Sequence, residues 1–422
     1  MKVVVLGAGI AGITTAWYLA SGGAEVTVID RAGEAAAETS HANGGHLSTQ
    51  SGVPWTSPSG LHDFLFSRFT PERTIRVRRR RDPGRFDWFV RALSAARPAA
   101  CRRASARLTR LADFSRASFE ALCAESGLDV SLEERGTLAL YRSERAFARA
   151  RKQRARGVRV FSHQDVLSHE PALAGAAVPI AGALHYPGDA TGDCRRFCMQ
   201  LGERSEAGGV VFRQGENVHR LHLERGVCRG VETDGGHYEA DACVAALGAQ
   251  SACFLRPWGI RLPILPLRGY TLTAPIDPAA PAPGGFSDPE RHLVFSRLGP
   301  RFRAAGMADF TGLNEIPDWG RGAQLERIVR EWYPALSCTG VEHWSCLRPM
   351  TPDGPPILGA SGIPGLWLNT GLGPLGWTLG CGAGRIVADL VLGKKPPIDS
   401  EGLTCQRFHR FAKQDPTSDL PA

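Results

Sequence analysis

The pattern of hydrophobic and polar positions is clearest at the start of the chain. Val3 to Leu6 form a short apolar run, which is typical of a strand buried on both faces of a sheet. Thr14 to Ala20 continue as an apolar helix, and a Gly-Gly pair ends it. Glu25 to Ile29 predict a second strand, which ends at Asp30. The first thirty residues therefore predict a strand, helix and strand unit of a parallel sheet.

A glycine-rich turn joins the first strand to the helix. Gly7 permits the tight turn, Gly9 lets a pyrophosphate approach the backbone, and Gly12 lets the helix pack closely on the strand. The helix dipole then faces phosphate, and the carboxylate of Asp30 can accept hydrogen bonds from an adenosine ribose. The unit predicts a dinucleotide site without distinguishing FAD from NAD. Its candidate residues are Gly7, Ala8, Gly9, Ile10, Ala11, Gly12, Asp30 and Arg31.

A second glycine cluster near the other end of the chain indicates which dinucleotide binds. Leu366 to Leu368 read as a strand, and Gly371 to Gly376 repeat the glycine spacing before a helix of small residues. No further strand and no ribose-binding acid follow, so a second nucleotide unit is not expected. We expect instead that the turn faces a flavin ring and that helix N-H groups stabilise negative charge on it. A tightly packed structural helix is the alternative. The candidate flavin contacts are Gly373, Leu375, Gly376, Trp377 and Thr378.

A polar, glycine-containing loop from Glu38 to His46 follows the first unit. Small residues let backbone approach a flat ring closely, so the loop is a second candidate for contact with a flavin. An ordinary surface loop is the alternative. The candidate contacts here are Ser40, Asn43, Gly44 and Gly45.

Length and composition limit the class of protein. A chain of 422 residues favours two interwoven domains, and 43% hydrophobic with 22% charged residues is typical of a soluble globular protein. Eleven cysteines occur without a CxxC pair, so we expect no metal site and no disulfide framework, which fits the cytoplasm. The apolar segment Val3 to Ala20 is interrupted by glycines and is interpreted as buried fold rather than as a signal peptide or a membrane span.

The net charge of +8 comes mainly from arginine and is densest between Arg73 and Arg91, where Arg78 to Arg81 are consecutive. A solvated surface is the favoured interpretation. Peripheral attachment to an anionic inner membrane surface is the second, and nucleic acid is the weakest because no binding module accompanies the run.

With these motifs in place, the chain resembles the bacterial FAD-dependent D-amino acid dehydrogenases of the small-subunit type, within the D-amino acid oxidase and glycine oxidase superfamily. The resemblance covers nearly the whole length. It lies in Val4 to Asp30, Glu38 to Trp55, Gly136 to Arg142, Thr191 to Cys194, Arg268 to Thr273, Leu347 to Gly354 and Asn369 to Thr378.

The resemblance implies a mixed α/β and α+β fold, with a Rossmann-type FAD-binding domain interwoven with a substrate domain built on an antiparallel sheet. We expect the FAD domain to comprise residues 1–60, 143–255 and 340–402. Residues 61–142 and 256–339 are then expected to form the substrate domain, and 403–422 a C-terminal tail. FAD contacts at Val218 and Gly248 belong to the same expectation.

The resemblance also implies the oxidation of a D-amino acid to an imino acid by hydride transfer to flavin N5. Water then releases the 2-oxo acid and ammonia, and the electrons pass to a quinone or another carrier. Arg348 matches the arginine that holds the substrate carboxylate in relatives, and Tyr270 matches a tyrosine close to the substrate. An arginine fork is well suited to a carboxylate, and the flavin takes the hydride, so no protein nucleophile is required. An amine that enters neutral, or loses its proton to water, also needs no dedicated base. His46 is considered only as a pocket residue, for which a structural role is the alternative.

Three positions depart from the family pattern. Relatives usually have His and Thr where this chain has Leu372 and Pro374, which leaves the substrate range and the acceptor open. Cys346 stands where relatives of this type usually have glycine, whereas the sarcosine oxidase branch has its flavin-linking cysteine in the corresponding motif. A covalent flavin is one hypothesis for Cys346, and a small buried cysteine is the other.

Two alternatives to a D-amino acid dehydrogenase stay open at this point. The first is an oxidase or dehydrogenase of a secondary or cyclic amine such as hydroxyproline, sarcosine or glycine. The second is an arginine-rich binding protein that keeps a nucleotide fold without catalysis.

Overall fold

The structure is a computed structural model of the chain. The run of consecutive arginines from Arg78 to Arg81 lies outside the residues that the structure describes. Those residues are 1–49, 53–58, 60–61, 72–77, 83–155, 157–277, 282–313, 316–337 and 339–411.

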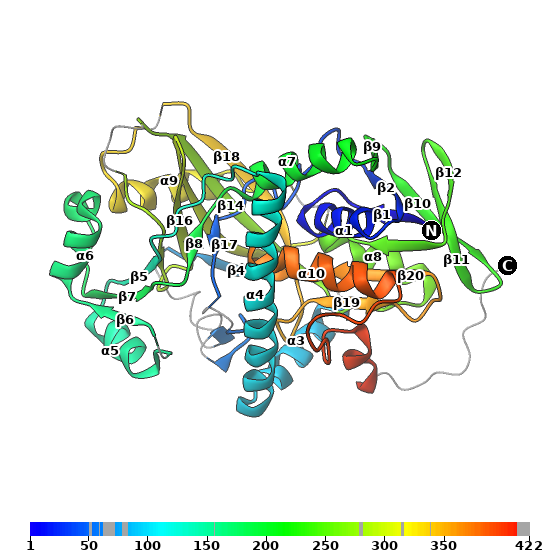
Figure 1. Cartoon of the computed structure of the whole chain (residues 1–422). Helices are drawn as coiled ribbons and strands as arrows, with labels where there is room; N and C mark the ends of the chain where they lie inside the picture. Colours follow the sequence, from blue (N-terminus) through cyan, green and yellow to red (C-terminus); the bar gives the residue numbers. More distant parts are fainter. Residues whose placement is uncertain are drawn as a thin grey trace.

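The first strand lies at the centre of a six-stranded sheet, on the right of Figure 1. Its order is β19-β20-β13-β1-β2-β9, and every neighbouring pair is parallel except β19 with β20. Segments from both ends of the chain therefore build one sheet. The strands are β1 (Lys2–Leu6), β2 (Glu25–Asp30), β9 (Val211–Gln214), β13 (Ala242–Ala245), β19 (Ile357–Ala360) and β20 (Leu366–Thr370).

The apolar run of β1 is buried on both faces, as its sequence predicts. Val3 and Val5 pack into a core with helices on one face of the sheet, while Val4 and Leu6 pack on the other face under a small three-stranded antiparallel sheet. The helices are α1 (Ile10–Ser21), α4 (Pro98–Ser126), α7 (Cys194–Ala207) and α10 (Gly376–Val391), and the small sheet contains β10 (Val218–Glu224), β11 (Val227–Thr233) and β12 (Gly236–Glu239).

A second large sheet, on the left of Figure 1, has the order β18-β14-β17-β16-β15-β5-β7-β6, with β4 paired to β17. It is mostly antiparallel. Its outer face packs on α9 (Gly320–Trp332) around a core of aromatic and aliphatic side chains. The strands are β4 (Ile75–Val77), β5 (Thr137–Tyr141), β6 (Arg159–Phe161), β7 (Gly182–Tyr186), β14 (Leu265–Pro275), β15 (Phe286–Asp288), β16 (Leu293–Leu298), β17 (Arg301–Phe310) and β18 (Glu342–Met350).

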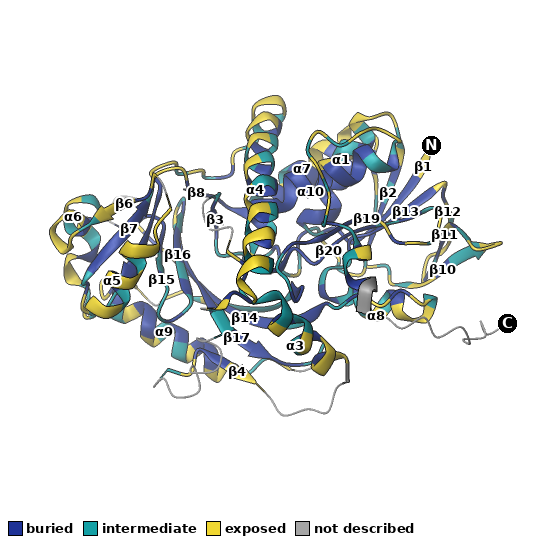
Figure 2. Cartoon of the chain, turned by 90° about the horizontal axis from the view of Figure 1, so that it is seen from below, coloured by how far each residue is buried: buried dark blue, intermediate teal, exposed yellow. Residues whose placement is uncertain are grey.

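Helix α4 crosses the molecule between the two sheets and packs on α10 through its buried side, while its other side is exposed (Figure 2). A two-stranded ribbon joins the halves near the expected cofactor site. The ribbon is β3 (His46–Leu47) with β8 (Ala190–Thr191). Further helices are α3 (Pro83–Ala95), α5 (Glu144–Gln153), α6 (His163–His169) and α8 (Ser251–Leu255), and the short 3-10 turns include η3 (Gly248–Gln250), η5 (Gly373–Leu375) and η6 (Cys405–Phe411).

The predicted fold class is confirmed, but the strand pairing redraws the expected domain limits. Strands β6, β7 and β18 belong to the substrate sheet, although their residues were expected in the FAD domain. Helix α4, expected in the substrate domain, packs into the FAD-domain core. Leu403 and Cys405, expected in a tail, are also buried, in the cores on the two faces of the six-stranded sheet. These differences arise because contacts between distant strands and helices, rather than local sequence, decide where a segment packs.

Candidate FAD and substrate site

The first glycine turn has the geometry that a dinucleotide site requires. Gly7 has φ +106°, a left-handed conformation suited to glycine. A Cβ at Gly12 would come 1.8 Å from the carbonyl oxygen of Gly7, so only glycine lets α1 begin this close to β1. Gly9 lies at the amino end of α1, remains partly accessible, and has only the Ser40 hydroxyl within 4 Å of an added Cβ. The turn therefore leaves backbone accessible at a helix N-terminus.

Two side chains brace this turn. Asp30 Oδ2 accepts a hydrogen bond from the N-H of Ala8 at 2.6 Å, and Ser40 Oγ accepts one from the N-H of Ile10 at 3.0 Å. The carboxylate of Asp30 therefore stands at the turn, where it can also accept ribose hydroxyls. The neighbouring Arg31 is exposed and paired with Glu38.

The second glycine turn lies at the amino end of α10. Gly371 and Gly373 have φ of +73° and +58°, and Leu375 and Gly376 are partly accessible. The Trp377 ring packs in the core between aromatic side chains of α4 and α7, so the residue can offer a cofactor only its backbone.

Thr378 ties α10 to the ribbon strand β3. Its hydroxyl accepts a hydrogen bond from the N-H of Ser48 at 3.2 Å and lies 3.3 Å from the carbonyl oxygen of His46, to which it donates. Thr378 therefore holds the second glycine turn in place, and its hydroxyl is already engaged.

Close packing of α10 on α1 brings the two glycine turns together. A Cβ at Gly380 would lie 2.4 Å from Ile10 Cγ1, and one at Gly384 would lie 2.4 Å from Thr14 Oγ1. The Thr14 hydroxyl donates to the carbonyl of Gly380 at 3.0 Å. Residues separated by more than 350 positions thus form one continuous site.

The loop from residue 38 to 46 lies beneath the inner face of the substrate sheet. A Cβ at Gly44 would come 2.5 Å from Val294 Cγ2, so its glycine permits this close approach. The rings of His41 and Trp344 stack with centroids 4.0 Å apart, and the Thr271 hydroxyl donates to the carbonyl of Ala42 at 3.0 Å. The loop is therefore held between the FAD-binding half and the substrate sheet, and it is not a free surface loop.

Arg348 projects from β18 on this inner face. Its guanidinium passes over Gly269 of β14, where an added Cβ would come 2.5 Å from Nη2. Nη1 donates to the carbonyl of Met307 at 2.9 Å and Nη2 to that of Gly306 at 3.4 Å. These carbonyls lie at a bulge in β17, where Met307 has φ +56°. The bulge and the glycine together fix the direction of the guanidinium.

The charge of Arg348 has no carboxylate partner among the residues that the structure describes. Burial lowers the pKa of its guanidinium, and the nearby thiol of Cys346 is the one group that raises it. Part of the Arg348 surface is still accessible. Strand β18 also lies against η3 and η5, the turns next to the expected flavin. A partly buried cation of this kind is well suited to receive an anionic group.

Tyr270 lies on the opposite face of the sheet from Arg348. Its side chain is buried in the core under α9, and its hydroxyl accepts a hydrogen bond from the N-H of Asp318 at 3.1 Å. The Arg321 guanidinium lies 5.9 Å from the centre of its ring. This position does not support the expected contact with substrate. The reason is strand parity, because Tyr270 pairs with Ser345, an odd number of residues from Arg348.

His46 is held by the substrate sheet. Its Nε2 lies 3.0 Å from the carbonyl oxygen of Phe295, and since a carbonyl only accepts, Nε2 must carry the proton. Burial lowers the pKa of His46, which favours the neutral ring. This bond favours a structural role over a role as proton acceptor.

Cys346 lies on the inner face, opposite Gly269 and two residues before Arg348. Burial raises the pKa of its thiol, with Arg348 and Thr39 acting in the opposite direction. A neutral thiol is a weak nucleophile, which favours a free cysteine over a flavin link.

Gly248 and Val218, the two other expected FAD contacts, lie at different sheets of the FAD-binding half. Gly248 follows β13, beside β1, and has φ +53°. A Cβ there would meet no atom within 4 Å, so space is open in front of this backbone. Val218 begins β10 in the small sheet and packs beside its core. Together with the accessible backbone at Gly9 and Gly376, the open space at Gly248 fits an extended dinucleotide such as FAD.

The groups that orient the Arg348 guanidinium, namely Gly269 and the carbonyls of Gly306 and Met307, were not predicted from the sequence. Gly269, a glycine inside a strand pattern, signals a close approach of another group and was available in the sequence. The bulge carbonyls of Gly306 and Met307 left no such signal, because backbone groups acquire their role only when the strands pair.

Comparison with known proteins agrees with this geometry. The family model described as DAO, FAD dependent oxidoreductase, matches residues 2–390. D-amino acid dehydrogenases of Allorhizobium ampelinum and Rhizorhabdus wittichii are 39% and 40% identical to the chain, over 97% of it and 99% and 100% of their own lengths. The crystal structure of glycine oxidase from Geobacillus kaustophilus has a TM-score of 0.71 at 22% identity, covering 96% of this chain and 98% of that one. The chain therefore belongs to the DAO family of FAD-dependent oxidoreductases and is an enzyme that uses FAD.

Proposed function

We propose that the protein oxidises a D-amino acid to its imino acid and that Arg348 holds the substrate carboxylate. The observation that supports this is the partly buried guanidinium, fixed by two backbone carbonyls and without a carboxylate partner among the described residues. The names of the relatives at 39–40% identity, D-amino acid dehydrogenase, favour the D configuration.

The residues of the chain act by orientation rather than by proton transfer. Arg348 grips one end of the substrate, and the inner face of the substrate sheet confines the rest. The two glycine turns would hold FAD, and the chemistry that it would supply there is that of a hydride acceptor. An amine that enters neutral needs no base, which agrees with the engagement of His46 by the Phe295 carbonyl.

We propose a quinone or a similar apolar carrier as electron acceptor. A cavity of about 200 Å³ adjoins the flavin-facing turn at Pro374 and Leu375. Trp55, Leu108 and Met350 are among its largely apolar lining residues. Leu372 is buried behind this turn, so the replacement of polar family residues by Leu372 and Pro374 makes the region more apolar. An apolar recess favours an apolar ring over a charged acceptor.

The stereochemistry and the acceptor can be tested on the flavin-loaded protein. Under anaerobic conditions, D-amino acids should bleach the flavin, whereas their L-enantiomers should not. Re-oxidation should then be faster with a short-chain quinone than with air, with little hydrogen peroxide. Bleaching by L-amino acids only, or by secondary amines such as sarcosine only, would overturn the proposed substrate. Stoichiometric peroxide in air would overturn the proposed acceptor.

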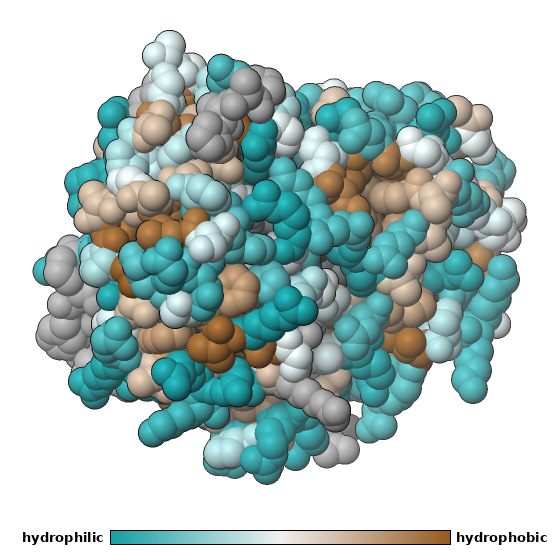
Figure 3. Space-filling model, turned by 60° about the vertical axis from the view of Figure 1, so that its left-hand side comes forward, coloured by the Kyte–Doolittle hydropathy of each residue, from teal (hydrophilic) through white to brown (hydrophobic). Residues whose placement is uncertain are grey.

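The proposed acceptor would be reached most directly from a membrane surface. No helix within the described part of the chain is long and apolar enough to cross a membrane. On the face shown in Figure 3, apolar side chains form separate groups among hydrophilic ones. Helix α3 exposes Phe86, Val90 and Leu93, spaced as one helical stripe. We therefore propose peripheral contact of α3 with an anionic inner membrane surface.

Vesicle sedimentation tests this contact. Wild-type protein should bind anionic vesicles at low salt, and the double variant Phe86→Ser, Leu93→Ser should bind much less. Val211→Ser is a matched control, because Val211 is an exposed apolar residue on β9. Equal binding of all three proteins, or no binding of the wild type, would contradict the proposal.

A further inference from the structure

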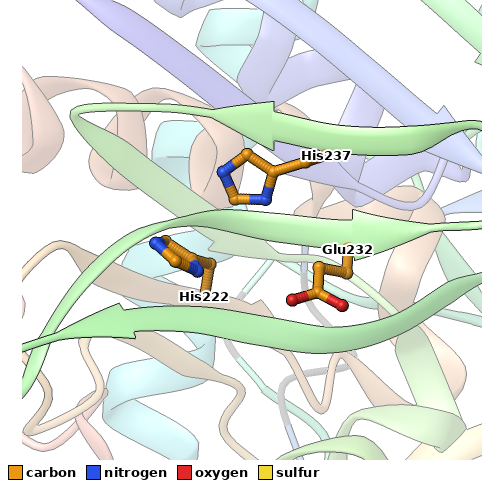
Figure 4. Close-up of side chains that lie close together, drawn as sticks. All are labelled: His222, Glu232 and His237. Carbon is orange, nitrogen blue, oxygen red and sulfur yellow. The ribbon is translucent and has the colours of Figure 1, made fainter.

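A cluster of two histidines and a carboxylate lies on the small three-stranded sheet. His222 is on β10, Glu232 on β11 and His237 on β12, so each strand supplies one side chain (Figure 4). One ligand atom from each residue lies within 4.8 Å of those from the other two. The site and its chemistry are separate from the flavin and from Arg348, because this sheet packs on the opposite face of β1 from α1.

Strand pairing explains why these side chains meet. Glu232 pairs directly with His237 on β12 and with Arg220 on β10. His222 is two residues beyond Arg220 and therefore on the same face, opposite Gly230. A Cβ at Gly230 would come 2.0 Å from the carbonyl oxygen of Tyr238 on β12, so glycine lets the strands of this sheet approach closely here. The other face, with Leu221 and Val231, packs into the core.

The arrangement is close to that of a transition-metal site. The imidazole rings of His222 and His237 are 4.5 Å apart between centroids and nearly perpendicular, at 80°. Ligand atoms around tetrahedral zinc stand about 3.4 Å apart, given metal bonds of about 2.0–2.1 Å. In the cluster these atoms lie within 4.8 Å of one another. The side chains of His222 and Glu232 are one third exposed, so small rotations can bring their ligand atoms to the shorter zinc spacing.

Charged side chains next to the cluster, Arg220 and Glu224, would affect how it binds a metal ion. Glu232 Oε2 accepts a hydrogen bond from Arg220 Nε at 2.7 Å, and Arg220 together with the two histidines lowers the pKa of the Glu232 carboxyl. Glu224 Oε1 lies 3.2 Å from His222 Nε2 and is near enough to supply an oxygen as a fourth ligand. A metal would thus receive two imidazoles and at least one carboxylate, and it would compete with Arg220 for Glu232.

We propose that His222, Glu232 and His237 bind one divalent transition-metal ion, with Zn²⁺ as the ion that best suits two imidazoles and a carboxylate. The ion would join all three strands, and because the unfolded chain does not hold these ligands together, it would stabilise the folded protein. Hard cations such as Mg²⁺, which prefer oxygen ligands, should not bind here.

The test is calorimetric titration of ZnCl₂ into the flavin-loaded, tag-free protein after dialysis against EDTA. We expect one Zn²⁺ per chain and a rise in Tm. His222→Ala and His237→Ala should each weaken the affinity at least about tenfold, since even residues behind a metal ligand contribute this much. The matched control is His219→Ala. His219 is an exposed histidine on the same strand that pairs with Asp234, so its loss should leave the affinity within about twofold.

Arg220→Gln separates a three-ligand site from a chance histidine contact. If Glu232 is a ligand, removal of the competing guanidinium should leave the affinity for Zn²⁺ unchanged or tighten it, while Glu232→Gln should weaken it. Three results would overturn the proposal. They are the absence of saturable Zn²⁺ binding, equal affinity in wild type and His237→Ala, and an equal loss in His219→Ala. None of these results depends on the enzymatic activity.

Discussion

Replacement of Arg348 offers the sharpest test of the proposed substrate site. Two of the five guanidinium N-H groups point to the carbonyls of Gly306 and Met307, which leaves three for a substrate carboxylate, enough for a bidentate pair. Loss of one partner of such a buried pair costs about 2–5 kcal/mol, or about 30- to 5000-fold in kcat/KM. Arg348→Ala should fall in this range. Arg348→Lys should lie between it and the wild type, because the charge remains but the fork is lost.

The assay is anaerobic reduction of the flavin in a stopped-flow instrument. A D-amino acid is compared with the amine that lacks only its carboxylate. If the guanidinium binds the carboxylate, the difference between wild type and Arg348→Ala should nearly vanish with the amine. Flavin content and Tm of each variant show whether the site is intact. A fully flavinated Arg348→Ala that oxidises the amino acid within about threefold of wild type would refute the assignment.

Four further predictions follow from the same region. Gly269→Ala should lower kcat/KM about 10- to 100-fold by displacing the guanidinium beside it, with FAD still bound; Gly175→Ala, where an added Cβ meets nothing within 4 Å, should leave kcat/KM unchanged. Because burial lowers the folded-state pKa of His46, the stability that its neutral ring contributes is complete above about pH 6.5 and is lost as the pH falls through the folded-state value. His46→Gln should therefore lose less Tm than wild type between about pH 7.5 and 5, and an equal loss would contradict this reasoning. Gly384→Ala, whose Cβ would lie 2.4 Å from a threonine oxygen of α1, should reduce the free energy of unfolding by about 1–3 kcal/mol in denaturant titrations. Acid precipitation should leave colourless protein and a yellow supernatant if Cys346 is free, and yellow protein would instead show the covalent link.

The nucleotide turn could be predicted from sequence because its signals are local. Gly7 and Gly12 make the tight turn and the close helix packing that their spacing predicts, and Asp30 lies beside the turn. The substrate sheet could not be predicted in this way. Its β5 pairs in parallel with β15, which lies more than 140 residues away, and no local pattern sets such a register.

The position of Tyr270 shows, at a single residue, that strand register could not be predicted from the local sequence. A motif can place Tyr270 and Arg348 on neighbouring strands, but the register decides which face each side chain occupies. A shift of one residue would exchange the faces. The observed pairing puts Tyr270 under α9 and leaves Gly269 beneath the guanidinium.

The interlocked glycines of α1 and α10 have a consequence for synthesis of the chain. The apolar helix α1 leaves the ribosome among the first residues, yet its partner at Gly380 and Gly384 emerges only near the end. Until then the apolar surface of α1 lacks its native cover, and such exposed surface favours aggregation. We expect FAD to be captured only after translation is nearly complete, so a truncation before α10 should yield insoluble protein without flavin.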